Sequence, residues 1–137
     1  MADSERRQRG IEMLKEVYAG DVVVPSEGYA FTDVMLEQVF AEVWSRDVLS
    51  IRDRRLLLLG IIAEKGEATT FGIQAKAALK RGELTPDELR ELLLMIAQYS
   101  GYPRAAGLIG TVEQKIAEFA KEKNEGKGKE KEAGQEG

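Results

Sequence analysis

Glu42 is the side chain best placed in this sequence to carry a proton. It is a carboxylate set in the apolar segment VFAEVW, and on a helix it lies at the border of an apolar stripe, beside Val39. A carboxyl group in a dry apolar pocket can act as a general acid or base near neutral pH. A carboxylate at the edge of the stripe that pairs with an arginine is the simpler interpretation, and the sequence leaves both open.

A group of arginines follows Glu42 at the start of the next helix, in the segment SIRDRR. An arginine can hold a substrate carboxylate through two parallel hydrogen bonds, and Arg54 is the candidate for that role. The alternative for Arg54 is a salt bridge with Glu42, Asp53 or Glu91. The arginine run is most simply a solvated or ion-paired first helical turn, because it does not continue as a basic face.

The composition excludes several classes of chemistry. The sequence has no cysteine, which rules out disulfides, thiol peroxidase chemistry and thiolate metal sites. It has no histidine either, so the commonest general base and the commonest transition-metal ligand are missing. We find no phosphate-binding glycine loop, nucleophile elbow or metal-ligand cluster. We therefore expect no cofactor and no metal.

Length and composition favour one soluble globular domain. The chain has 137 residues, 43% of them hydrophobic, a net charge of −4 and a pI near 5.1. The acidic balance weighs against nucleic acid or an anionic membrane as a partner. The N-terminal segment MADSERRQRG has no apolar run, and the longest apolar run, Leu56 to Ala63, is too short to span a bilayer. These features predict a cytoplasmic protein.

Apolar residues recur at helical spacing along most of the chain, which predicts an all-α fold. We expect a single-domain bundle of about six helices. Residues 1–30 form an N-terminal helix and a connection, residues 31–120 the main helical domain, and residues 121–137 a disordered charged tail. The expected helices run from Ser4 to about Ala19, Asp33 to about Arg46, Ser50 to about Ala63, about Thr69 to Lys80, Pro86 to about Ser100, and about Arg104 to Lys121.

The helix that follows Thr85 has the strongest local signal. Thr85 is a good N-cap, Pro86 suits the first helical position, and Glu88 completes a capping box. Gly101 can adopt the left-handed conformation that ends a helix, and Pro103 prevents its continuation.

Three segments, taken in order, resemble the carboxymuconolactone decarboxylase family. They are EVWSRDVLSIRDRRLLLL, IQAKAALKRGELTPDELRELLL and AQYSGYPRAAGL, which begin at Glu42, Ile73 and Ala97. The family pattern joins a tryptophan and an Arg-Asp-Arg helix start to a Thr-Pro-Glu-Glu-type helix start and to Tyr-x-Gly-x-Pro. The resemblance covers roughly Phe31 to Phe119. It implies an all-helical fold that assembles as trimers or hexamers, with pockets between subunits.

The sequence departs from this family at the positions that carry its chemistry. Decarboxylase-like members usually have a histidine where Gln74 stands, and many have one where Met95 stands. The alkylhydroperoxidase branch uses a Cys-x-x-Cys pair with histidine. This sequence has neither, so peroxidase activity by that route is excluded.

The candidate site that remains combines the residues with the resemblance. Glu42 and Arg54 are the catalytic candidates. The candidates for substrate binding are Gln74, Tyr99, Tyr102, Trp44 and Met95. Each could instead have a purely structural role: a place in the core or in a subunit interface for Trp44, and side-chain packing for the others.

Two functions fit the sequence. The first is a decarboxylase-like lyase that acts on a small organic acid or lactone by proton transfer from Glu42, with Arg54 holding a carboxylate and Gln74 or Tyr99 orienting the substrate. The second is a non-catalytic oligomeric binding or scaffold protein on the same fold, suggested by the absence of histidine and cysteine.

Assembly into a homo-trimer or homo-hexamer is expected for either function. The segments Leu56–Ala63 and Leu92–Tyr99 are apolar around most of their circumference, and a small domain has few internal neighbours to enclose both. We expect subunit contacts through these segments, unless the first helix and residues 22–30 cover them.

Overall fold

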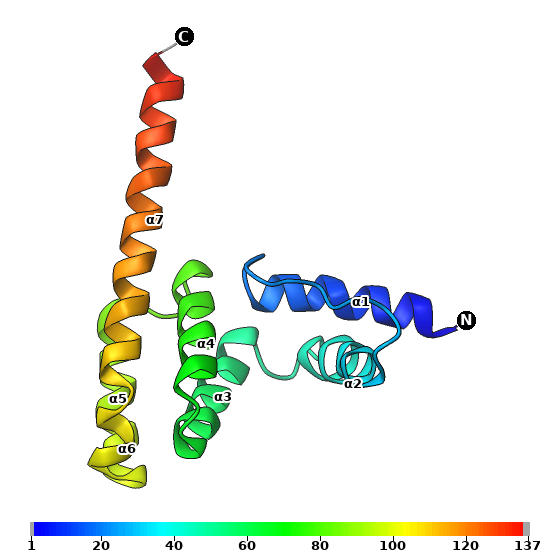
Figure 1. Ribbon diagram of the computed structural model, residues 1–137, viewed down its shortest axis with the longest axis horizontal. Helices are drawn as coiled ribbons and strands as arrows, with labels where there is room; N and C mark the ends of the chain where they lie inside the picture. The colour runs from blue at the N-terminus through cyan, green and yellow to red at the C-terminus, as the bar shows by residue number, and fades with distance from the viewer. Residues whose placement is uncertain (1, 136–137) are drawn as a thin grey trace. The chain divides into compact units, whose positions relative to one another are not determined.

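The computed structural model describes the backbone of residues 2–135 and the side chains of residues 5–127. Every regular element in this part of the chain is helical, which confirms the all-α class (Figure 1). The chain divides into two compact units, one up to Leu58 and one from Leu59 on. This division falls inside a helix, whereas the sequence places a boundary near residue 30. Each unit is described in turn.

The first unit is built on the contact between its N-terminal helix and a π-helical segment. It contains α1 (Ala2–Val17), α2 (Ala30–Val34), the π-helix η1 (Met35–Trp44) and the first part of α3 (Ile51–Lys65). α1 packs against η1. The side chains that form the core between them are Leu14, Val17, Leu36, Phe40 and Trp44.

A glycine permits the close approach of α1 to η1. Gly10 is buried, and a Cβ atom at this position would lie 2.1 Å from the carbonyl oxygen of Leu36. No other residue fits this contact unless the two backbones move apart. The crossing of the helices therefore depends on Gly10.

The second helix differs from the sequence-based expectation of one α-helix over residues 33–46. A short α2 leads into η1, whose wider turns are closed by hydrogen bonds between residues five apart. The spacing of four between Leu36, Phe40 and Trp44 aligns them along the face that meets α1. The sequence was interpreted with α-helical periodicity, so the wider π-helical turns of η1 were not predicted.

The second unit contains the end of α3 and four further helices: α4 (Ala68–Lys80), α5 (Pro86–Ser100), α6 (Tyr102–Ala106) and α7 (Ile109–Gln135). The long α7 packs against α4 and α5 (Figure 1). Phe71 and Ala75 of α4, Leu89 of α5 and Val112 of α7 are fully buried. The core of this unit therefore includes side chains from all three of these long helices.

The start of α5 confirms the predicted capping box. The backbone N–H of Glu88 donates to the Thr85 hydroxyl oxygen at 3.1 Å, and the Thr85 N–H donates to the Glu88 carboxylate at 3.0 Å. Pro86 begins the helix. Gly101, with φ of 98°, ends it.

The C-terminal part of the chain departs from the expectation. The predicted last helix is divided into α6 and α7, and α7 continues to Gln135 where the sequence predicts a disordered tail over residues 121–137. Residues 136 and 137 lie outside the described residues. Glutamate and lysine are good helix formers, and Glu122 is tied to Lys76 of α4, so the helix is supported beyond its apolar stripe.

No helix in residues 2–135 combines the length and the apolar character that a bilayer crossing would require.

Candidate functional site

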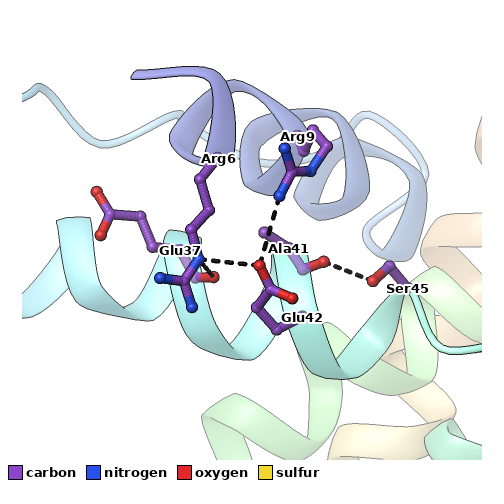
Figure 2. A network of polar contacts seen from close by, with 6 residues as sticks. All are labelled: Arg6, Arg9, Glu37, Ala41, Glu42 and Ser45. Atoms are coloured by element: carbon purple, nitrogen blue, oxygen red, sulfur yellow. Dashed lines mark hydrogen bonds and ion pairs between the residues drawn. The ribbon is translucent and has the colours of Figure 1, made fainter. Parts of the chain in front are cut away.

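Glu42 is held by two arginines from α1 (Figure 2). The Arg6 Nε–H donates to Glu42 Oε1 at 2.9 Å, and Arg9 Nη2 donates to the same oxygen at 3.4 Å. Arg6 Nε also lies 3.0 Å from the Glu37 carbonyl oxygen on η1. The Glu42 side chain is 46% exposed. The structure thus shows Glu42 as an ion-paired carboxylate within reach of water.

A second set of contacts fixes the register of α1. Arg7 donates to the Asp33 carboxylate at 3.0 Å and to the Pro25 carbonyl oxygen at 2.7 Å. The Gly28 N–H donates to the other Asp33 oxygen at 3.0 Å. The hydrogen bonds from Arg7 and Gly28 hold the pKa of Asp33 below its usual value. Together with Gly10, these contacts place Arg6 and Arg9 over Glu42.

Arg54 has an unused hydrogen-bond donor. Its Nη2 donates to the Arg46 carbonyl oxygen at 3.2 Å, while its Nε is buried and has no hydrogen-bond partner among the described residues. In the described part of the first unit, neither Glu42 nor Asp53 forms a salt bridge with it. A buried guanidinium N–H without a partner is costly, and an anionic ligand would satisfy it.

Arg55 is not solvated, whereas the sequence predicts a solvated or ion-paired first turn. Its side chain is fully buried, its guanidinium lies 5.7 Å from the centre of the Trp44 ring, and it donates to the Val17 carbonyl oxygen. Trp44 also stacks on Phe40, with ring centres 6.4 Å apart. Trp44 therefore lies in the core of the first unit, the structural alternative that the sequence left open for it.

The remaining candidates lie in the second unit. Gln74 is buried in α4, beside Ala75. Met95 and Tyr99 of α5 are exposed, and the exposed Tyr102 hydroxyl accepts a hydrogen bond from Gln98 at 2.9 Å. The structure thus gathers Glu42 with Arg6 and Arg9 in the first unit, where Arg54 also lies.

Comparison with known sequences identifies the family. The sequence pattern of the carboxymuconolactone decarboxylase family matches residues 30–114. The chain belongs to this family. The match includes Glu42, Arg54, Gln74 and Tyr99, but it begins after α1.

Two relatives of the chain are named decarboxylases. A 4-carboxymuconolactone decarboxylase from Acinetobacter baylyi is 27% identical over 120 residues, which cover 83% of this chain and 89% of the relative. A nitrosuccinic acid decarboxylase from Metarhizium robertsii is 31% identical over 100 residues, which cover 69% of each chain. Both names describe the loss of carbon dioxide from an organic acid.

The two arginines that hold Glu42 therefore come from outside residues 30–114, the part that the family's sequence pattern matches. Sequence reasoning missed them because they precede Glu42 by more than thirty positions. The local sign of these arginines in the sequence was the charged segment SERRQRG, which we interpreted as a polar N-terminus.

Sequence reasoning also missed a buried ion cluster in the second unit. Lys76 of α4 is 7% exposed, and its ammonium donates to Glu122 at 2.9 Å and to Glu118 at 3.3 Å. Burial alone would lower the pKa of Lys76, but the hydrogen bonds to the two glutamates outweigh it and raise the pKa. In the sequence, the sign of this cluster is a lysine that lies between Ala75 and Ala77, on the apolar stripe of the helix that is now α4.

Proposed function

We propose that the protein is a decarboxylase-like lyase that acts on a small organic acid or lactone acid. The observation that carries this proposal is the buried, unpartnered Nε of Arg54 in a chain of the carboxymuconolactone decarboxylase family. The names of the two relatives support the reaction class. The identity of the acid is left to experiment.

The reaction needs a cation and an acid. When the bond between the carboxylate carbon and the neighbouring carbon breaks, carbon dioxide leaves and the electron pair stays on the substrate as an enolate. A nearby cation stabilises that negative charge, and an acid then protonates the carbon. Arg54 would bind the substrate anion through its free donor, and Glu42 would deliver the proton.

Glu42 must exchange partners during this reaction. It has the exposure that proton uptake from water requires, but it forms ion pairs with Arg6 and Arg9 at rest. In our proposal it accepts a proton from water, leaves its arginine partners and donates the proton to the substrate carbon. The substrate contacts that the sequence suggests stay predictions; they involve Gln74, Tyr99, Met95, Tyr102 and Trp44.

Turnover of carboxymuconolactone and related acids by the pure protein, followed as release of carbon dioxide, tests the proposal. Glu42→Gln should abolish turnover, and Arg54→Gln should both lower kcat and raise KM, because it removes the cation beside the developing enolate and a contact with the bound acid. Glu37→Gln is the matched control, since Glu37 is also a carboxylate of η1 but uses only its backbone oxygen to contact Arg6. Unchanged turnover in Glu42→Gln would refute these roles.

A non-catalytic oligomeric binding protein is the second candidate. The absence of histidine and cysteine from the sequence favours it. Exposed apolar side chains on α5 fit the oligomeric assembly expected for either candidate: Leu94 is 52% exposed, Met95 58% and Tyr99 84%. They lie in the segment that we expect to form subunit contacts in a homo-trimer or homo-hexamer. Ligand-dependent shifts of the melting temperature without turnover would support this candidate over the lyase.

Light scattering tests the assembly that we propose for either function. A mass three or six times that of the 15.2 kDa chain is expected. A monomer mass that is stable on dilution would contradict it.

A further inference from the structure

The second unit contains a cavity that the proposed reaction does not use. It has a volume of about 260 Å³ and lies among α5, α6 and α7. An apolar cavity of about 150 Å³ is large enough to bind benzene, so this one holds a single ring with a small substituent. Its lining residues come from three helices of one unit, so the cavity is complete within that unit.

The interior of the cavity is apolar. Leu93, Ala97 and Ala105 are buried and form part of its lining, while Leu94, Ala106 and Ile109 line it with exposed side chains. Apolar surface of this kind gains free energy when a ligand displaces water from it. The lining therefore selects a compact apolar body.

The charged side chains of the cavity decide the sign of the ligand. Arg90 donates to both carboxylate oxygens of Glu113, at 2.8 and 3.0 Å, and to Asp87 at 2.9 Å. Hydrogen bonds from Arg90 hold the pKa of Glu113 below its usual value, so the pair stays charged near neutral pH. One guanidinium with two carboxylates carries a net charge of −1. A ligand carboxylate would meet an arginine that is already occupied and two like charges.

Tyr102 offers a hydrogen-bond donor to a ligand. Its hydroxyl oxygen accepts from Gln98, which leaves the hydroxyl proton as a donor, and the side chain lines the cavity. A hydroxyl or carbonyl oxygen on the ligand can accept this proton.

From the apolar lining, the occupied arginine and the Tyr102 hydroxyl, we infer that the α5–α6–α7 cavity binds a neutral monocyclic compound with one hydroxyl or carbonyl group, and rejects the corresponding carboxylate. This preference for a neutral ligand is opposite to that of the proposed reaction site, where Arg54 would bind an anion. The inference does not depend on catalysis.

Titration of the full chain with 4-fluorophenol and with 4-fluorobenzoate, followed by fluorine NMR at pH 7, tests it. We expect the phenol to bind with a Kd on the order of 1 mM, as befits a ligand of this size, and the benzoate to bind at least tenfold more weakly. Equal binding of the two probes, or no binding of the phenol at 10 mM, would overturn the inference. Leu93, Leu94 and Ala97 lie in the segment that we expect to form subunit contacts, so an assembly that covers the cavity would also prevent phenol binding and would overturn the inference.

Two variants locate the binding. Ala106→Phe places a ring in the cavity from an exposed position and should weaken phenol binding at least tenfold, and Ile109→Gln should weaken it a few fold by removing part of the apolar wall. Ala120→Phe is the matched control on the exposed surface of α7 outside the cavity, and should leave binding unchanged. Phenol binding that survives Ala106→Phe in a folded protein would show that the probe binds elsewhere.

A charge exchange tests the selectivity. Asp87→Asn combined with Glu113→Gln leaves Arg90 without carboxylate partners and changes the net charge of this group from −1 to +1. The double variant should bind fluorobenzoate more tightly than the native protein does, with little change for the phenol. An unaltered preference would contradict the electrostatic part of the inference, whatever the result of the turnover experiments.

Discussion

The two units each contain a charged group held between two partners of opposite charge, and the two arrangements differ in burial. In the first unit, Glu42 lies between Arg6 and Arg9 with 46% of its side chain exposed. In the second, Lys76 lies between Glu118 and Glu122 with 8% of its side chain exposed. A buried ion whose partner is removed destabilises a protein strongly, whereas exposed pairs contribute little. The Lys76 cluster is therefore suited to hold helices together, and the Glu42 group can change partners at small cost.

The largest effect that we predict concerns the scaffold of the first group. Gly10→Ala should destabilise the first unit by about 3 kcal/mol, because the new Cβ would clash with the Leu36 carbonyl oxygen and force α1 away from η1. Urea denaturation measures the loss. Gly60→Ala is the matched control: nothing lies within 4 Å of its added Cβ, so it should stabilise α3 by roughly 1 kcal/mol. Equal effects of the two changes would mean that α1 is not held at this contact.

Removal of both carboxylates from the buried cluster comes next. Glu118→Gln with Glu122→Gln should cost about 2 kcal/mol, because the buried Lys76 ammonium loses its charged partners while the two glutamates themselves are partly exposed. Lys76→Met fills the same space without a charge and should be close to neutral. If the double variant is as stable as Lys76→Met, the cluster does not hold α4 to α7.

The buried cluster should also respond to pH at both ends of the scale. The pKa of Lys76 is raised, so its contribution is complete below about 10.5 and is lost as the pH rises through the higher folded-state value. The pKa of Glu118 is lowered, because hydrogen bonds from Lys76 and Lys115 outweigh burial, which would raise it. Its contribution is complete above about 4.5 and is lost as the pH falls through the lower folded-state value.

The urea midpoint between pH 7 and 11 measures the alkaline effect. This midpoint should fall more steeply with pH in the native protein than in Lys76→Met. The additional loss of stability at high pH should be smaller than the loss caused by Glu118→Gln with Glu122→Gln. Parallel pH curves for the two proteins would contradict the role assigned to the ammonium group.

The smallest effect is expected at the exposed group. Arg6→Gln, Arg9→Gln and Glu42→Gln should each change the free energy of unfolding by less than about 0.5 kcal/mol. The same denaturation assay measures this. A loss as large as that of the Lys76 cluster would show that the Glu42 group is structural and would weaken its assignment as a proton carrier.

Local signals in the sequence predicted local structure well. Thr85, Pro86 and Glu88 specify the start of α5 because their interactions span only three positions. The cap of α3 is similar, since the Asp53 N–H donates to the Ser50 hydroxyl at 3.0 Å. Both caps could be predicted from residue types alone.

Interactions between distant residues were not predictable in the same way. Glu42 was singled out as either a proton carrier or an ion-paired carboxylate, but its partners come from α1. Arg55 was placed in a solvated or ion-paired turn because its contacts with Trp44 and Val17 depend on tertiary packing. The length of α7 was underestimated for a related reason: a polar segment without apolar periodicity predicts disorder unless a contact such as that of Glu122 with Lys76 is known.

The packing of α1 against η1 also has a consequence for how this protein can be divided. A fragment cut at residue 30, where the match to the family's sequence pattern begins, would keep every residue that this pattern matches. It would also expose the apolar faces of Leu36, Phe40 and Trp44, which α1 covers with Leu14 and Val17. Such a fragment would be prone to aggregate and would attract chaperones, although its sequence still carried the complete family pattern. A soluble piece of the first unit must therefore include Leu14 and Val17 of α1.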